Sequence, residues 1–202
     1  MKKKYILLLM LLFIIIISIC LIYRNNNKED TDIKVKYPIY EYYKLNKVIT
    51  ENINYYLKDN TDNYYFLYID YKDYEYKEYI SIVLYISYFT GGAHPNYEIK
   101  TINYNKSTNK FIDIDDLINR DKDILNKLSI YSREYFSNND MFNDKVVFDM
   151  MIDGTKSIKD NYKYFNITSD GLIIYFNRYQ IAPYYYGDYS ITIPYNYLDL
   201  SI

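Results

Sequence analysis

The sequence predicts an α+β fold, in which an N-terminal transmembrane helix is followed by a mostly antiparallel sheet with helices packed on it. Three observations support this prediction. An uncharged apolar run occupies residues 5–23, strand-like segments rich in β-branched and aromatic residues are joined by short turns, and the helical segments do not alternate strictly with the strands. The rest of the 202-residue chain suits one compact domain, or two small lobes that share a core.

The first element is the apolar run at residues 5–23, YILLLMLLFIIIISICLIY, which holds no charge, glycine or proline. Nineteen residues in a helix rise about 28 Å, close to the hydrocarbon thickness of a bilayer. Three lysines at residues 2–4 precede the run and Arg24 follows it, so the positive-inside rule leaves residues 1–4 as a cytoplasmic stub. We therefore expect a single-pass protein of the cell membrane, with its N-terminus in the cytoplasm and its ectodomain outside.

Two alternatives to a retained anchor stay open. A cleaved signal peptide normally ends in a small-residue site of the A-x-A type, and no such site is visible between Ser18 and Asn27. A lipoprotein would be modified at Cys20, but Ile19 occupies the position where a small residue is expected. Cys20 is also the only cysteine, so the chain cannot form an intramolecular disulfide.

The charge beyond the anchor limits the class of partner. After Arg24 the sequence carries 26 acidic and 20 basic residues, a formal charge of −6. An acidic ectodomain argues against nucleic acid and anionic polymers as partners, and it favours a cationic protein by raising the encounter rate. The 31 tyrosines supply rigid area with a polar tip, but AT-rich codon usage is the preferred explanation of their number, so the excess alone is weak evidence for a binding surface.

Residues 24–36 are polar at their start and predict a linker, and residues 37–95 are expected to form the N-terminal half of the ectodomain. Within this half, residues 44–58 predict a helix, because their apolar side chains recur on one helical face. That face consists of Leu45, Val48, Ile49, Ile53, Tyr56 and Leu57.

Two strands are expected after this helix, at residues 64–70 and 79–89, where β-branched and aromatic residues dominate. The second strand has one face that is clearly apolar. It consists of Ile80, Ile82, Leu84, Ile86 and Tyr88. The opposite face is mixed and consists of Ser81, Val83, Tyr85 and Ser87.

Residues 96–202 are expected to form the C-terminal half. One hairpin is predicted around residues 105–109, and another around the Ser169-Asp170-Gly171 turn, where glycine permits the backbone that such turns need. Strands are expected at residues 98–104, 110–113, 165–168, 172–179 and 189–194, and helices at 114–119, at 122–135 and in part of 141–158. The apolar stripe of the longest helix consists of Ile124, Leu125, Leu128, Tyr131 and Tyr135.

The stretch at residues 89–98, FTGGAHPNYE, holds two of the five glycines and the only histidine of the chain. Gly91 and Gly92 permit a turn after the preceding strand, and Pro95 stiffens the loop. His94 has no framed nucleophile beside it, and a metal site would need more ligands than the sequence brings near it. The sequence therefore predicts no enzyme activity, no cofactor and no metal site, and it favours a structural turn or a contact loop.

Three stretches resemble a known family: FTGGAHPNYE at residues 89–98, FIDIDDLI at 111–118, and ITSDGLIIYFNRYQIAPYYYGDYSITIPY at 167–195. They are similar to an extracytoplasmic domain of RsiV-type anti-sigma factors and of the non-catalytic region of PdaC-type peptidoglycan deacetylases. The front half, including KVITENINYYL, resembles the companion N-terminal half of the same proteins.

The resemblance covers about residues 36–202 and implies a wall-facing α+β receptor domain, which binds lysozyme in the RsiV-like members. It does not extend to a sigma-binding segment, because only residues 1–4 precede the predicted span, or to a deacetylase domain.

The loops at residues 90–97 and 181–188 carry the most specific matches, and they are the predicted contact surface. Pro183 stiffens the second loop, and its three consecutive tyrosines offer aromatic anchors of the kind that dominate interfaces. A core-packed crossover is the alternative for this loop. The predicted partner-binding residues are Thr90, His94, Pro95, Tyr97, Pro183, Tyr184, Tyr185 and Tyr186. The predicted turn residues are Gly91, Gly92, Gly171 and Gly187.

The sequence thus predicts a membrane-anchored, RsiV-like extracytoplasmic binding module. Its expected partner is lysozyme or another cationic wall-active protein, which it would meet as a decoy, an inhibitor or a sensor. The main alternative is a peptidoglycan-associated accessory domain that positions cell-wall enzymes, for which an acidic surface is less suitable. A hydrolase that uses His94 with carboxylates is a second rival, and loss of turnover on replacing His94 would distinguish it.

The predicted topology can be checked on intact protoplasts. If residues 5–23 are a retained anchor, added protease should remove the chain beyond residue 24, because that part lies outside. Blotting with an antibody against the ectodomain measures the loss. Complete protection would contradict the topology, and a secreted form that begins after Ser18 would indicate signal cleavage instead.

Overall fold

The computed structural model describes residues 13, 15–18, 31–58 and 64–200, and it divides the chain into two compact units, Met1–Thr31 and Asp32–Ile202. Most of the predicted span at residues 5–23, and the stub before it, lie outside the described residues, and the five residues of the span that are described are helical. Across the described ranges, no helix combines the length and the apolar character needed to cross a bilayer. The membrane anchor therefore stays a prediction.

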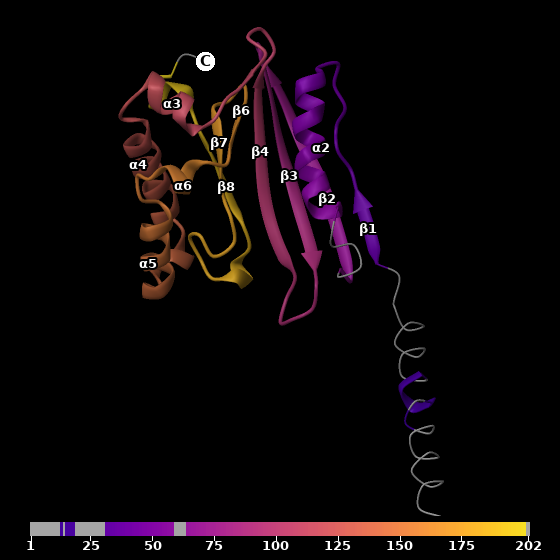
Figure 1. The fold of residues 1–202 in the computed structure, drawn as a ribbon. Coiled ribbons are helices and arrows are strands. Elements are labelled where there is room, and N and C mark those ends of the chain that lie inside the picture. The colour runs from indigo at the N-terminus through magenta and orange to yellow at the C-terminus, as the bar shows by residue number, and fades with distance from the viewer. Residues whose placement is uncertain (1–12, 14, 19–30, 59–63, 201–202) are drawn as a thin grey trace, which may run out of the picture. The chain divides into compact units, whose positions relative to one another are not determined.

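The second unit is built on a five-stranded sheet, sheet A, in which the strands lie in the order of the chain (Figure 1). It consists of β1 (Asp32–Val35), β2 (Phe66–Tyr76), β3 (Tyr79–Phe89), β4 (Asn96–Asn105) and β5 (Lys110–Phe111). The sheet is mixed, because β1 runs parallel to β2 whereas every other pair is antiparallel. Two differences from the sequence prediction follow. Residues 32–35 of the expected linker are a strand, and β2 continues six residues beyond its expected end at residue 70.

One face of sheet A is covered by α2 (Tyr43–Leu57), as the apolar periodicity predicts. Leu45, Ile49, Ile53 and Tyr56 of this helix are buried, and they pack on the apolar face of β3. Each such side chain stabilises the fold by about 1.5–3 kcal/mol on burial. The helix therefore covers the face of β3 that the sequence marks as core.

The other face of sheet A is covered by a second sheet, sheet B, which the sequence analysis did not separate from the first. Sheet B consists of β6 (Phe165–Ile167), β7 (Leu172–Phe176) and β8 (Tyr189–Ile193), all antiparallel. As a result the first half of β3 is buried on both sides, and Ser81 and Val83 are both fully buried, whereas Tyr85 further along the same face is 38% exposed. In the covered half, the mixed composition reflects a polar interface between two sheets and not contact with solvent.

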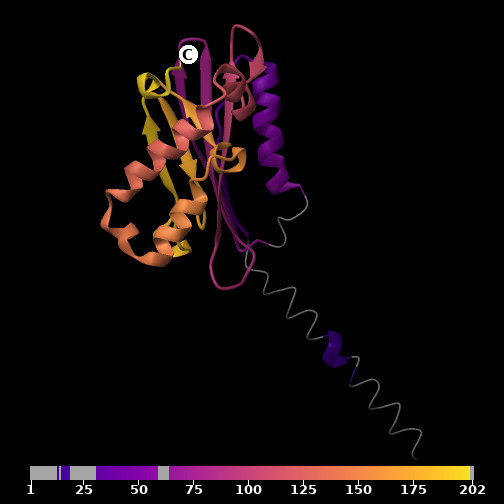
Figure 2. The ribbon, with the colours of Figure 1, turned by 90° about the vertical axis from the view of Figure 1, so that its left-hand side faces the viewer.

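Helices cover the side of sheet B that faces away from sheet A, as Figure 2 shows from that side. They are α3 (Ile114–Arg120), α4 (Ile124–Ser137), α5 (Lys145–Gly154), α6 (Lys159–Tyr162) and α7 (Tyr195–Leu198), with the short 3-10 helix η2 (Asp140–Asn143). A second 3-10 helix, η3 (Tyr184–Tyr186), lies in the loop before β8. In α4 the predicted stripe is correct at Ile124 and Leu128 but wrong at its end. Tyr135 is exposed, and the adjacent Phe136 fills the core in its place.

Sheet B is held on sheet A by hydrogen bonds from side chains of one sheet to the backbone of the other. The Asn103 amide on β4 donates to the Phe165 carbonyl at 2.9 Å, and the Asn166 amide on β6 donates to the Ile82 carbonyl at 3.1 Å. In the reverse direction, the backbone NH groups of β6 donate to hydroxyl groups on sheet A. The pairs are Phe165 to Thr101 Oγ1 at 3.2 Å and Ile167 to Ser81 Oγ at 3.0 Å.

The helical layer contacts the segment after β7 at Gly154, the last residue of α5. A Cβ atom at this position would lie 1.9 Å from the Gln180 carbonyl oxygen, so only glycine fits. The Gln180 amide in turn donates to the carbonyls of Gly154 and Asn161, at 3.1 and 3.0 Å. Gly154, the isolated glycine of this helical stretch, is therefore the residue at which the segment after β7 packs against the helices.

Asn103→Ala should lower the free energy of unfolding by about 1–3 kcal/mol, because the buried Phe165 carbonyl would lose its hydrogen-bond donor. Urea denaturation measures the change. The exposed Asn126 provides a matched control, and Asn126→Ala should change the stability by no more than about 0.5 kcal/mol. A neutral Asn103→Ala variant would show that apolar packing alone holds the two sheets together.

Candidate functional site

The two loops predicted to bind a partner lie against each other. The imidazole of His94 stacks on the ring of Tyr184, with 3.8 Å between ring centroids and 22° between planes. The Tyr184 hydroxyl donates to the Pro95 carbonyl at 2.7 Å. The two loops, 89 residues apart in sequence at these positions, therefore form one surface at one end of sheet A.

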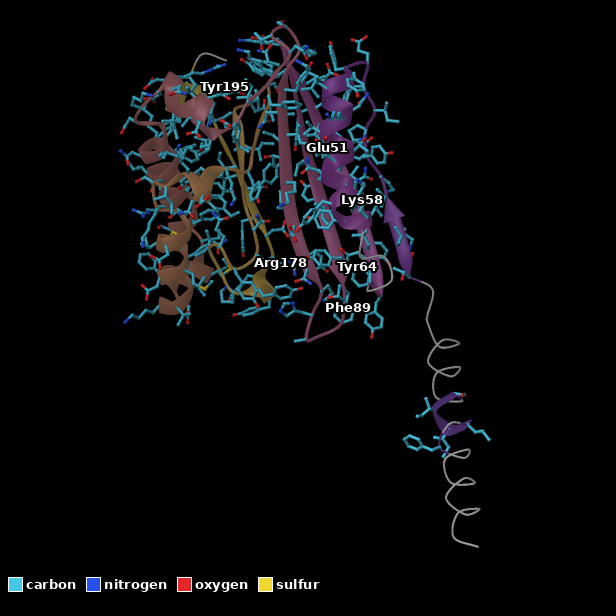
Figure 3. The ribbon with its side chains drawn as sticks, in the orientation of Figure 1. Glu51, Lys58, Tyr64, Phe89, Arg178 and Tyr195 are labelled. Carbon is cyan, nitrogen blue, oxygen red and sulfur yellow. The ribbon has the colours of Figure 1, made fainter. Side chains whose placement is uncertain are left out.

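Arg178 is the central residue of this surface, and the sequence analysis did not identify it. Its guanidinium carbon lies 3.6 Å from the ring centroid of Tyr97 and 4.7 Å from that of Tyr184, which are cation–π contacts. Its Nε lies 3.8 Å from the Asp188 carboxylate. Figure 3 labels Arg178 just beyond β7 and Phe89 at the end of β3, where the two loops begin. The sequence signal that could have identified Arg178 is its position beside Tyr179 in the stretch 167–195, which carries part of the family resemblance.

The three consecutive tyrosines have three different environments. Tyr184 is half-buried and joins the loops, and Tyr186 packs against the large core under the helices. Tyr185 is 75% exposed and its ring lies against that of Tyr186. Ile181 and Ala182, earlier in the same loop, are buried. The loop is therefore partly packed into the core, as the alternative interpretation of the sequence expects. Tyr185 is the most exposed of the three consecutive tyrosines.

The first loop is shaped by its glycines. Gly92 has a φ of +114°, and no atom would lie within 4 Å of a Cβ added there. Its requirement for glycine is therefore conformational and not steric. The predicted turn residues all have positive φ: +98° at Gly91, +114° at Gly92, +148° at Gly171 and +87° at Gly187. Thr90 and His94 are exposed and Pro95 is half-buried.

Between the loops and the strands lies a pocket of about 210 Å³ that the sequence analysis did not predict. It occupies the part of sheet A that sheet B leaves uncovered, beyond the buried Val83 and Ile99. Its lining includes Tyr68, Asp70, Tyr85, Tyr97, Arg178 and Asp188. In the part of the chain that the structure describes, no group of three His, Cys, Asp or Glu residues is arranged to hold a metal ion.

Glu98, directly after the first loop, fixes the base of the site on the α2 side. Its carboxylate accepts hydrogen bonds from the hydroxyls of Tyr56 at 2.7 Å and Tyr88 at 2.9 Å, and it lies 3.5 Å from the Lys100 amine. Burial acts to raise the pKa of Glu98, but the hydrogen bonds from the two tyrosines and the charge of Lys100 outweigh it, so the pKa is lowered. Burial and the bond to Glu98 raise the pKa of Tyr88 to about 12, which keeps this hydroxyl a donor.

Comparison with known proteins places the second loop and Arg178 in a described family. Residues 115–196 match DUF3298, whose description is "Protein of unknown function". The chain carries a DUF3298 domain. This domain holds β6, β7, β8 and most of the helices, whereas sheet A and the loop around His94 precede it.

The DUF3298 match is accompanied by similarity to a curated protein. Over 127 residues the chain is 37% identical to the peptidoglycan-N-acetylmuramic acid deacetylase PdaC of Bacillus subtilis strain 168. The similarity covers 62% of this chain but only 27% of PdaC, so it concerns about a quarter of that protein. This outcome agrees with the resemblance to the PdaC-type proteins found in the sequence.

Two crystal structures of DUF3298 family proteins share the fold. One is from Pseudomonas aeruginosa PAO1, with a TM-score of 0.57 and 19% sequence identity. The match covers 75% of this chain and 67% of the Pseudomonas chain. The other is from Bacteroides fragilis NCTC 9343, with a TM-score of 0.51 and 20% sequence identity. The match covers 77% of this chain and 61% of the Bacteroides chain. At these identities the likeness concerns the fold alone.

The lowered pKa of Glu98 predicts how stability depends on pH. A carboxyl group with a depressed folded-state pKa contributes stability that is present above its unfolded-state pKa, about 4.3 for glutamate, and is lost as the pH falls through the folded-state value. The stability difference between the wild type and Glu98→Gln should therefore shrink in acid. Urea midpoints between about pH 7 and pH 3 measure it. Glu134→Gln, at an exposed site, is the control, and a Glu98→Gln difference that stays constant with pH would contradict the assignment.

Proposed function

We propose that the DUF3298-containing unit is a binding module for a cationic wall-active protein, with lysozyme as the first candidate. The single observation that carries the proposal is the joined surface of the loops at residues 90–97 and 181–188. A continuous aromatic surface held by defined contacts loses little side-chain freedom on binding, which favours affinity. The stacking of His94 on Tyr184 and the Tyr184–Pro95 hydrogen bond provide that order.

The residue types on this surface suit a protein partner. Tyr185 and Tyr179 are 75% and 57% exposed, and the guanidinium of Arg178 is fixed on Tyr97. Tyrosine and arginine are the residues that most often dominate binding energy at interfaces. We assign Tyr185 as the main anchor, because Tyr184 and Tyr186 are already occupied by contacts within the fold.

The charge of the chain supports a cationic partner. The formal charge of −6 after Arg24 attracts a basic protein over distances of about a Debye length, roughly 8–10 Å at physiological salt. If residues 5–23 anchor the chain in the membrane, the surface would face the cell wall, where the module would serve as a decoy, an inhibitor or a sensor.

We propose a role in binding and not in catalysis. His94 is the only histidine, and both of its ring nitrogens face groups of the protein itself. Nδ1 lies 3.0 Å from the Pro95 carbonyl, and Nε2 lies 3.4 Å from the Tyr179 hydroxyl. A general base needs a nitrogen that can reach the proton of a substrate or nucleophile.

A second candidate function is an accessory module that positions cell-wall enzymes on peptidoglycan. It is favoured by the similarity to PdaC, whose name gives N-acetylmuramic acid in peptidoglycan as its substrate. Purified cell wall that retains this chain in a sedimentation assay, in the absence of any protein partner, would support this candidate over the first.

The lysozyme proposal can be tested by surface plasmon resonance with immobilised lysozyme and the full-length chain in detergent. Tyr185→Ala should weaken binding by about 2 kcal/mol, roughly 30-fold in Kd, because it removes the exposed anchor. Tyr43→Ala is a matched control, since Tyr43 is 79% exposed and lies at the start of α2. Raising the salt concentration should slow association more than it speeds dissociation.

Two results would contradict this proposal. No binding at concentrations on the order of tens of micromolar would exclude lysozyme as the partner. Equal affinities of the wild type and Tyr185→Ala would keep the partner but remove the loops as its binding surface.

A further inference from the structure

The pocket beside Arg178 has features of a small-molecule site that a protein interface does not require. Tyr85 and Tyr97 each expose 38% of their surface, although they continue a sheet face whose other half is buried under sheet B. With Tyr68 they give the pocket aromatic walls, and Arg178 and Asp188 close it from the loop side. Concave sites with mostly apolar walls and a few fixed polar groups are typical of ligand pockets.

Arg178 presents hydrogen-bond donors to this pocket. Its side chain is 21% exposed and lines the pocket, and its guanidinium is fixed by stacking on Tyr97. Its Nε is buried and has no hydrogen-bond partner among the described residues. An arginine side chain carries five N–H donors and no acceptor. A ligand that contacts the guanidinium must therefore offer acceptor oxygens.

Three acidic residues line the pocket: Asp70, Asp188 and Glu98. The carboxylate of Glu98 is already bound by two tyrosines and Lys100, whereas the other two require the opposite chemistry to Arg178. Asp70 and Asp188 accept hydrogen bonds, so a ligand that meets them must also carry donors. Each carboxylate already has a basic neighbour: Lys36 Nζ lies 3.4 Å from Asp70, and Arg178 Nε lies 3.8 Å from Asp188. The pocket is thus close to neutral. It favours neither a cation, which Arg178 and Lys36 would repel, nor an anion, which the two carboxylates would repel.

The size of the pocket limits the ligand to about one ring. A volume of about 210 Å³ is smaller than the roughly 300–1,000 Å³ of pockets that enclose drug-sized ligands. A neutral pyranose has C–H groups on its faces that pack on aromatic rings, and hydroxyl groups on its rim that both donate and accept. It meets all three demands of the lining: an apolar face, acceptors for Arg178, and donors for Asp70 and Asp188.

We infer that the pocket between Tyr85 and Arg178 binds a neutral sugar ring of a glycan. This inference goes beyond the proposed function, because it concerns a pocket that binds a small molecule in the absence of any protein partner, although it shares Tyr97, Arg178 and Asp188 with the loop surface. The tyrosine rings would hold the face of the sugar, and the guanidinium and the two carboxylates would select its hydroxyl or amide groups.

The inference can be tested with three sugars that share one ring and differ in charge: N-acetylglucosamine, which is neutral, glucosamine, which is cationic, and N-acetylmuramic acid, which is anionic. The full-length chain is kept in a detergent without a sugar head group, and saturation-transfer NMR measures binding. N-acetylglucosamine should bind best, with a Kd of about 1 mM, which is typical of a ligand of this size. Its affinity should depend little on salt.

Variants identify the site. Tyr85→Ala and Arg178→Lys should each weaken binding at least about tenfold, the first by removing an aromatic wall and the second by removing the planar donor fork. Tyr85→Phe keeps the ring and should retain binding. Tyr43→Ala, a change at an exposed tyrosine that is not part of the pocket lining, should have no effect. Melting curves of each variant confirm that the fold is intact.

Three results would overturn the inference. The first is no saturation transfer from any of the sugars. The second is a preference for glucosamine that falls with salt, which would make the pocket a cation site. The third is N-acetylglucosamine binding that is unchanged in Tyr85→Ala and Arg178→Lys. Arg178 contributes to the loop surface as well, whereas Tyr85 lies on β3 outside the loops at residues 90–97 and 181–188. Because no lysozyme is present, the sugar results with Tyr85→Ala do not depend on the protein-binding proposal.

Discussion

The polar contact between the two sheets determines where everything else lies. Ser81, Thr101 and Asn103 on sheet A bond to the backbone of β6, and Asn166 of β6 bonds back to β3. Such hydrogen bonds are directional, and a buried group that loses its partner costs about 1–3 kcal/mol. Apolar packing alone would tolerate several positions of one sheet on the other, whereas these bonds select one register.

The position of sheet B then determines the site. The segment after β7 leaves the interface towards the end of sheet A, rests on the helices through Gly154 and Gln180, and brings Arg178 over Tyr97. The same segment delivers Tyr184 to Pro95. A rigid scaffold thus holds both ends of the loop, which is the usual relation between loops and the elements that support them.

Local patterns in the sequence were sufficient for part of this arrangement. Helix α2 was predictable from its 3.6-residue periodicity, and the turn at Gly171 from the needs of a tight hairpin. The second sheet was not, because the polar residues that bind β6 give β3 the alternating composition of a strand with one solvated face. Arg178 was also missed, since its role depends on Tyr97, which is remote in sequence and close only in the fold.

The order of strands in sheet A has a consequence for how the chain folds. Strands β2 to β5 are neighbours in sequence as well as in space, so this sheet can assemble from successive hairpins before residues 165–193 are synthesised. Until sheet B docks, one face of sheet A is open. Ser81, Thr101 and Asn103 are hydrated in that interval, and an open face that includes them is less adhesive than an apolar one. The groups that align the two sheets in the native state thereby lower the risk of aggregation in the nascent chain.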